Sequence, residues 1–255
     1  MKKKALILAP ALGLGLVAMG AAAPAMADHA AGSYSATLNE INNSGASGEA
    51  WIDVEGTVAT VTLNASNLAA EFDGNPYPHV QHIHIGAQGV CPDMSVDANG
   101  DGIISTTEGA PSYGGIGTTL SVGDADKSPA AGTDLTVAPW GATIEYKETF
   151  ELNQETQDSL ANGTAVIVVH GLDPATQPEG ATAPSDLVPE LPLAATSPAL
   201  CGALKMQPAG GVDTGVAGTG NTGGIDAGML AIGGVIGAAA VGGAYVFARR
   251  ANATR

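Results

Sequence analysis

Short runs of alternating apolar and polar residues recur through residues 28–207 and predict β-strands. With a period of two, every second side chain lies on the same face of a strand, so one face is buried and the other is solvated. Glu55-Gly56 separates two of these runs and is typical of a hairpin turn. The predicted strands are Ser33–Asn39, Gly48–Glu55, Thr57–Ser66, Val80–Gly86, Thr118–Val122, Ala142–Leu152, Thr164–His170 and Leu200–Met206.

About eight short strands, punctuated by Gly, Pro, Asn and Asp, predict an all-β sandwich or barrel. One short segment, Gln154–Ala161, has the pattern of a helix. Two long insertions, 88–117 and 171–198, are rich in Gly, Pro and acidic residues. Loops of that length are more often functional than idle, so we expect functional residues near them.

The two ends of the chain have the patterns of targeting segments. Lys2 to Lys4, an apolar stretch and Ala25-Met26-Ala27 predict a cleaved secretory signal peptide. An uncharged apolar stretch followed by Arg249-Arg250 predicts a membrane helix with a cytoplasmic C-terminus. The expected organisation is a signal peptide at 1–27, a folded domain at 28–207, a Gly/Thr-rich tether at 208–226, a transmembrane helix at 227–248 and a basic tail at 249–255.

A short motif before the apolar stretch, Val216-Ala217-Gly218-Thr219-Gly220, leaves a second mode of attachment open. Together with the apolar span and the basic tail, it resembles a bacterial cell-wall sorting signal, with Val216 where Leu is expected. Linkage to the cell wall is therefore an alternative to a plain membrane anchor.

The expected ectodomain is strongly acidic. Residues 28–225 carry 24 acidic side chains against three lysines and no arginine. Phosphate contacts need Lys and Arg, so nucleic acid is excluded as a partner. An acidic surface attracts cations, which makes metal ions the expected partners.

Histidines are rare in the chain but concentrated in one stretch: three of the five lie in HVQHIH, residues 79–84. On a strand, His82 and His84 lie on the same face and are close enough to share one metal ion. His79 has the opposite parity, and His170 ends a distant apolar strand. Imidazole suits copper and zinc, so these four residues are the candidate ligands. The alternative is that the histidines are solvated or only hydrogen-bonded.

Cys91 and Cys201 are the two cysteines of the chain, and in a secreted protein they predict a disulfide. Shortly after Cys91, residues 97–108 (DANGDGIISTTE) match the pattern of a calcium loop at every position. Gly109-Ala110-Pro111 follows at once, so we expect no helix after the loop. An acidic solvated turn is the alternative. The candidate calcium ligands are Asp97, Asn99, Asp101, Ile103 through its carbonyl, Ser105 and Glu108.

Several of these segments resemble a chordin-type domain. GSYSATLNEINNSGASGEAWIDVEGTVATVTLNASNL precedes HIHIG, which matches the H-I-H-x-G motif of that family. AVIVVHGLD and ALCGALK are also similar to Cu,Zn superoxide dismutases. The resemblance covers most of residues 33–206 and implies a Greek-key β-barrel in which the disulfide ties the loop after His84 to the last strand.

The chain also departs from the dismutase pattern. No histidine lies between His84 and His170, so the zinc-bridging ligand is missing. Pro198 stands where the dismutases have the arginine that guides superoxide. The resemblance therefore implies at most a copper-only site made by His82, His84 and His170, with His79 as a further candidate.

Three hypotheses follow. We favour a secreted, surface-anchored, metal-binding domain of chordin type, with a histidine metal site, a calcium loop and no established catalysis. The first alternative is a copper-only enzyme that resembles superoxide dismutase. The second is a structural or adhesive surface domain whose histidines only hydrogen-bond inside the fold.

Overall fold

Strands β1 (Gly32–Glu40), β2 (Ser47–Glu55) and β3 (Val58–Ser66) form a meander in the computed structural model, which describes residues 30–72 and 74–208. The alternation predicted from the sequence is present in all three strands. On β1, Tyr34, Ala36 and Leu38 are buried, whereas their neighbours are exposed or half-buried. Tyr34 lies opposite Ile52, another buried residue, so the apolar faces of adjacent strands coincide.

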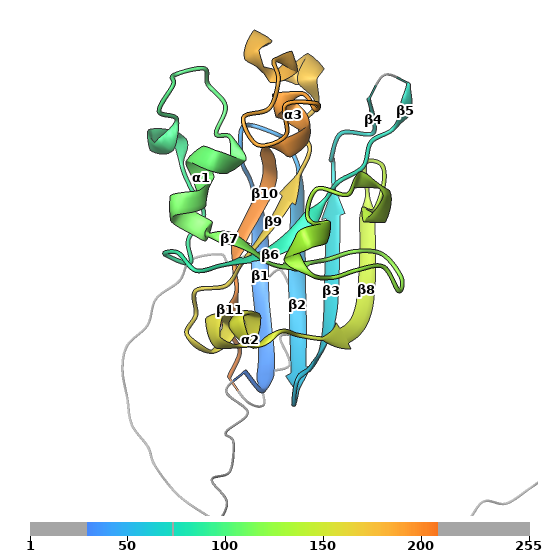
Figure 1. Ribbon diagram of the computed structural model, residues 1–255, viewed down its shortest axis with the longest axis vertical. Helices are drawn as coiled ribbons and strands as arrows, with labels where there is room; N and C mark the ends of the chain where they lie inside the picture. The colour runs from blue at the N-terminus through green and yellow to red at the C-terminus, as the bar shows by residue number, and fades with distance from the viewer. Residues whose placement is uncertain (1–29, 73, 209–255) are drawn as a thin grey trace, which may run out of the picture. The chain divides into compact units, whose positions relative to one another are not determined.

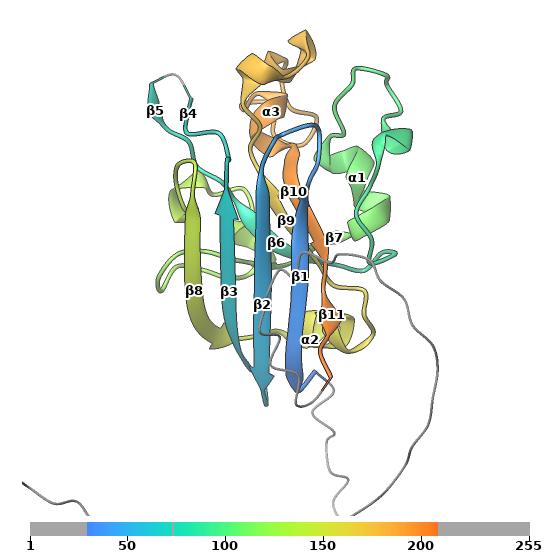
Figure 2. The ribbon, with the colours of Figure 1, turned by 180° about the vertical axis from the view of Figure 1, so that it is seen from behind.

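Strand β8 (Ile144–Glu151) pairs with β3 and completes the first layer, whose long strands lie side by side in Figure 2. The second layer has the order β7-β6-β9-β10 and crosses in front of the first in Figure 1. Its central strands, β6 (Gln81–Ile85) and β9 (Val166–His170), are buried on both faces. Ile83 on β6 and Ile167 on β9 pack into the core between the layers. The residues next to them in sequence lie on the opposite face of each strand and point outward, under the long insertions.

The layers join where β1 pairs with β10 (Pro198–Ala203) at Asn39 and Cys201. The order β10-β1-β2-β3 is a Greek-key arrangement, in which a distant strand returns beside the first of three consecutive strands. Chain connections from β3 to β6 and from β7 to β8 cross between the layers. The prediction of an antiparallel all-β fold is confirmed.

The remaining elements are short. The single predicted helix is α2, with the predicted bounds Gln154–Ala161. β7 begins and ends three residues earlier than predicted, because Gly115 and Ile116 pair with β6 although their sequence lacks a strand pattern. The other elements are β4 (Glu71–Phe72), β5 (Asn75–Pro76), α1 (Thr106–Tyr113), β7 (Gly115–Thr119), α3 (Leu193–Thr196) and β11 (Lys205–Met206).

Helix α1 corrects the expectation that no helix follows residue 108. Ser105 caps the helix: its hydroxyl accepts a hydrogen bond from the Glu108 amide, and the Glu108 carboxylate accepts one from the Ser105 amide. This reciprocal pair satisfies two amides that a helix start otherwise leaves open. Pro111 lies beyond the first turn, and the helix ends two residues later at Tyr113. Capping therefore outweighs the unfavourable Gly109-Ala110-Pro111 sequence.

The insertion that contains α1 is attached to the sheets at two points. Asn42, at the end of β1, donates to the carbonyls of Ile104 and Pro198 and accepts from the Ile104 amide. The predicted disulfide joins Cys91 to Cys201 on β10. Both attachments hold the insertion against the outer face of β6 and β9.

Several predicted segments lie outside the described residues. These are the signal peptide at 1–27, the sorting-signal motif at 216–220, the apolar segment at 227–248, the basic tail at 249–255 and nearly all of the tether at 208–226. Of the helices in residues 30–72 and 74–208, none combines the length and the hydropathy of a membrane span.

Loss of the disulfide should lower the stability of the domain strongly. The bond closes a loop with a sequence separation of 110 residues, for which the chain-entropy description gives about 4–5 kcal/mol. We expect a Cys91→Ala/Cys201→Ala variant to unfold at a markedly lower urea concentration, measured by circular dichroism. A reductant should lower the midpoint of the unmodified protein and leave that of the variant unchanged. Equal midpoints for both proteins without reductant would contradict this role.

Candidate metal centre

His82 and His84 lie on the outward face of β6, and His170 lies on the same face at the end of the neighbouring strand β9. Register fixes this arrangement: His82 is opposite Val168, and the His170 amide bonds to the carbonyl of Val80. Residues two apart on one strand share a face, so His170 is the diagonal neighbour of His82. All three side chains are buried, with exposed fractions of 2–3%.

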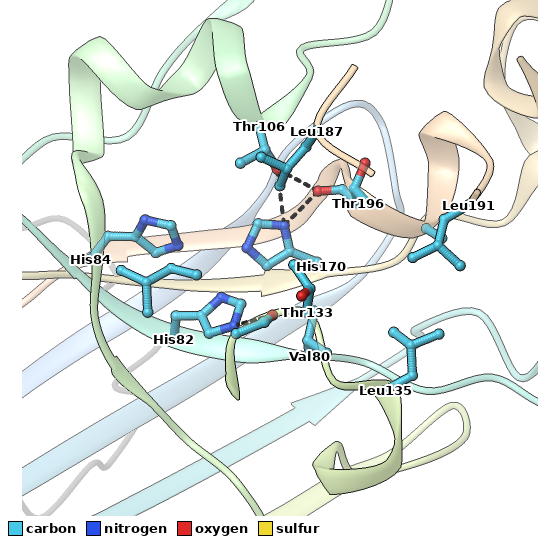
Figure 3. Close-up of a pocket in the computed structure, with 13 residues that line it drawn as sticks. Val80, His82, His84, Thr106, Thr133, Leu135, His170, Leu187, Leu191 and Thr196 are labelled. Carbon is cyan, nitrogen blue, oxygen red and sulfur yellow. Dashed lines mark hydrogen bonds between the residues drawn. The ribbon is translucent and has the colours of Figure 1, made fainter. Parts of the chain in front are cut away.

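The three rings converge, as Figure 3 shows. Their centroids are 5.1 Å apart for His82 and His170, 5.4 Å for His82 and His84, and 5.8 Å for His84 and His170. One ring nitrogen from each residue lies within 4.8 Å of the other two. In the part of the chain that the structure describes, this is the one group of three or more His, Cys, Asp or Glu residues with such spacing.

Each imidazole donates one N–H group to a backbone carbonyl. His82 Nε2 lies 2.9 Å from the Gly132 oxygen, His84 Nδ1 lies 2.9 Å from the Gly114 oxygen, and His170 Nδ1 lies 2.7 Å from the Thr196 oxygen. A carbonyl oxygen only accepts, so each bond assigns the proton to that nitrogen. The opposite nitrogen of each neutral ring is left with a free lone pair.

Those opposite nitrogens are His82 Nδ1, His84 Nε2 and His170 Nε2, and each is buried without a hydrogen-bond partner in the described residues. An unsatisfied buried acceptor costs about 1–3 kcal/mol. Three such nitrogens lie close together, and a cation that prefers nitrogen ligands would accept all three lone pairs. Ligating histidines commonly donate their other N–H to a carbonyl, and these three do so.

The electrostatics of the site keep the rings neutral. Burial lowers the pKa of His84 to about 4, against the opposing effect of its bond to Gly114. Burial, together with the nearby His84, lowers the pKa of His170 to about 3. The pKa of His82 is held well below its ordinary value by burial first and then by His170 and His84. Neutral imidazole is the form that ligates a metal, so the site is ready for one at neutral pH.

Two glycines provide carbonyls for these bonds, and at Gly114 the backbone of Ile85 leaves no room for a side chain. Gly114 has φ of +95°, and a Cβ there would lie 1.9 Å from the Ile85 oxygen. At Gly132, a Cβ would lie 2.3 Å from Ile116 Cδ1. The acceptors are backbone atoms of loops, Gly114 in the first insertion and Gly132 in the β7–β8 connection, so a search of the sequence for ligand residue types does not find them.

The other predicted ligand, His79, lies apart from the convergent group. Its Nδ1 is 2.9 Å from the His170 carbonyl oxygen, and its Nε2 is 2.8 Å from that of Ala69. Both ring nitrogens therefore face carbonyl oxygens, and neither is aimed at the space between the other rings. His79 is three residues before His82, and residues an odd number apart lie on opposite faces of a strand, so the sequence also separates it from His82 and His84.

Residues 97–108 form a closed loop whose oxygens accept from its own amides. Asp97 accepts from Gly100 and Gly102, Asn99 from Asp101, Asp101 from Ile103, and Glu108 from Ala98 and Ser105. Ser105 also donates to Asp186 of the second insertion. The carboxylates of this loop are not among the convergent groups of the described residues. Calcium binding stays a prediction from the sequence pattern.

Comparison with known proteins gives distant matches. No family model matches the chain and no curated protein matches it, so the chordin-type resemblance stays a prediction. The Cu(II) structure of superoxide dismutase 5 from Candida albicans matches with 13% identity and a TM-score of 0.38, over 73% of this chain and 99% of that chain. A mutant of the same enzyme matches with 15% identity and a TM-score of 0.37, over 73% and 98%. The function is therefore inferred from the residues of this chain.

Replacement of Gly114 should weaken metal binding by displacing the carbonyl that orients His84. Loss of such an outer partner typically costs 10–100-fold in metal affinity. We expect Gly114→Ala to show at least a tenfold weaker affinity for copper, measured by competition with a chelator. Gly115→Ala is the matched control, because a Cβ at Gly115 meets no atom within 4 Å. Equal affinities for the two variants would show that the Gly114 carbonyl does not orient the ligand.

Proposed function

We propose that this domain binds one copper ion through His82 Nδ1, His84 Nε2 and His170 Nε2. The observation that carries the proposal is the convergence of three buried, unpartnered imidazole nitrogens whose opposite nitrogens are all engaged by backbone carbonyls. His79 is outside this ligand set, because carbonyl oxygens occupy both of its nitrogens.

The donor set favours copper over zinc. Imidazole nitrogen suits both ions, and the divalent affinity order puts copper first. No carboxylate or thiolate lines the pocket over the histidines in the described part of the chain, so nothing there neutralises a second positive charge. A buried site without anionic ligands holds a monovalent ion at lower cost than a divalent one. Copper has a stable monovalent state and zinc does not.

The chain's own residues set the position and the protonation of the ligands. The carbonyls of Gly132, Gly114 and Thr196 hold the three N–H groups, so the rings are oriented before the ion arrives. Tyr113 packs edge-on against His84 at 4.6 Å and limits its rotation. When bound by His82, His84 and His170, copper would supply one-electron chemistry at the pocket that these residues line.

Ligand removal without loss of the carbonyl bonds tests the proposal. The side-chain amide of Asn can donate in place of a His Nδ1, and that of Gln can donate in place of a His Nε2. The variants are therefore His84→Asn and His170→Asn, whose histidines donate through Nδ1, and His82→Gln, whose histidine donates through Nε2. After dialysis of the full chain against equal copper and zinc, we expect about one copper per chain by elemental mass spectrometry. Nitrogen hyperfine couplings in the Cu(II) electron paramagnetic resonance spectrum should identify imidazole ligands.

Each of the three variants should lose the bound copper, and the control His79→Gln should retain it. A chain that retains no copper, or that retains zinc in its place, would overturn the proposal. Copper that persists in all three variants would place the ion elsewhere.

An oxidoreductase that resembles superoxide dismutase is the second candidate function. The observation that favours it is a pocket that reaches all three histidines, because turnover requires an open position at the metal. If this candidate is correct, the copper-loaded chain accelerates superoxide decay in pulse radiolysis, and His82→Gln abolishes the acceleration. Decay no faster than with the metal-free chain excludes the enzyme and leaves the binding function.

The proposal also includes calcium at residues 97–108 and a location at the cell surface. Calcium is supported by the complete ligand pattern, which runs from Asp97 to Glu108. An extracellular location is supported by the Cys91–Cys201 disulfide, because such bonds persist in oxidising compartments. The apolar stretch before Arg249 supports anchoring through the C-terminal end.

A further inference from the structure

The pocket over the three histidines has apolar walls. Leu135, Leu187 and Leu191, from the loops on either side, lie around the opening (Figure 3), and Val80 and Ile116 also line the pocket. The cavity volume is about 30 Å³, which is room for one small molecule. Leu187 is 46% exposed, so it stands at the boundary with solvent. A ligand that approaches the histidines from this side passes aliphatic side chains.

Polar groups in the walls are mostly engaged with one another. The Thr106 hydroxyl donates to the Thr196 carbonyl, and the Thr196 hydroxyl pairs with that of Ser185. Of the three threonines that line the pocket, only Thr133, which is exposed, offers a ligand a hydroxyl without such a bond. Loss of hydration without replacement bonds is costly for a charged molecule and nearly free for an apolar one.

Within the described residues, no charged side chain lines this pocket. Lys127 donates to the carbonyls of Ser121 and Gly123, Lys147 is paired on β8 opposite Thr62, and Lys205 is on β11. None of the three lysines lines the pocket.

Acidic residues border the rim instead. Each of the three rim leucines is adjacent in sequence to an exposed acidic residue: Asp134 precedes Leu135, Asp186 precedes Leu187, and Glu190 precedes Leu191. Asp186 is held in place by the Ser105 hydroxyl at 2.9 Å. A rim of this charge repels anions over distances of about 8–10 Å at physiological salt.

We infer that this pocket admits a small, uncharged molecule, of the size of a diatomic gas, to the open side of the metal and excludes anions. The inference rests on the proposed copper site and names the class of ligand that the site accepts. It also disfavours superoxide, an anion, as the substrate. Leu187 controls the selectivity between uncharged molecules and anions, because it lines the pocket and is also exposed to solvent.

The selectivity is tested by binding of one uncharged and one anionic probe to the copper-loaded full chain. Carbon monoxide is followed on Cu(I) by its infrared stretch, and azide is followed on Cu(II) by its charge-transfer absorption. Leu187→Lys places a cation at the opening. Val122→Lys is the matched control, because Val122 is similarly exposed at 40% and lies outside the pocket lining.

We expect the unmodified protein to bind carbon monoxide at one per copper. Its Kd for azide should be at least tenfold higher than that of Leu187→Lys and equal to that of Val122→Lys. Carbon monoxide affinity should change less than threefold among the three proteins. The inference would be overturned if the unmodified protein bound azide as tightly as Leu187→Lys does.

A second measurement needs no metal. Apolar cavities take up xenon, so the metal-free chain under xenon should show shifted methyl resonances for Leu135, Leu187 and Leu191, and iodide should leave them unchanged. Iodide shifts, or no response to xenon, would overturn the inference. Copper content separates this result from the proposed function: a chain without copper refutes the metal site, whereas a copper-loaded chain that binds azide tightly refutes only the selectivity.

Discussion

The hydrogen bonds from three imidazole N–H groups to backbone carbonyls are the interactions on which the candidate site depends. Without them, each ring would have two equivalent tautomers and free rotation, and His82, His84 and His170 would be three buried polar side chains in a crowded space. With them, one nitrogen of each ring is consumed and the other is aimed inward. The donor geometry of the site is thus set by the path of the loops that carry Gly114, Gly132 and Thr196.

The β-sheets contribute a different constraint. Strand register puts His82, His84 and His170 on one face, but that face points away from the core between the layers. An uncovered face would leave the histidines hydrated, with ordinary pKa values near 6.5. The two insertions and the β7–β8 connection cover it, which lowers those pKa values and creates the apolar approach at the same time. Burial of the three histidines and the apolar lining of the pocket therefore have one structural origin.

Sequence patterns predicted the strands and the grouping of His82, His84 and His170, and did not predict the loops that surround the three rings. Alternation identified β1, β2 and β3 because one face of that layer is solvated. The spacing of His82 and His84 indicated that the two rings lie together, because strand geometry alone puts them on one face. Helix α1 was missed because the Ser105–Glu108 capping pair outweighs local propensity. The carbonyl acceptors and the rim leucines were missed because their positions depend on tertiary loop paths, which have no local period.

Strand order along the chain also decides when the site becomes complete. His82 and His84 are made early, but His170 needs β9, and its orienting carbonyl belongs to Thr196, just before β10. β10 then pairs with β1, the first strand of the domain, so the two layers close only after about residue 201 has emerged. Contacts of such long sequence separation form late in folding. The nascent chain accordingly lacks the convergent group of His82, His84 and His170, and the copper ion proposed to bind there would enter a domain that has already folded.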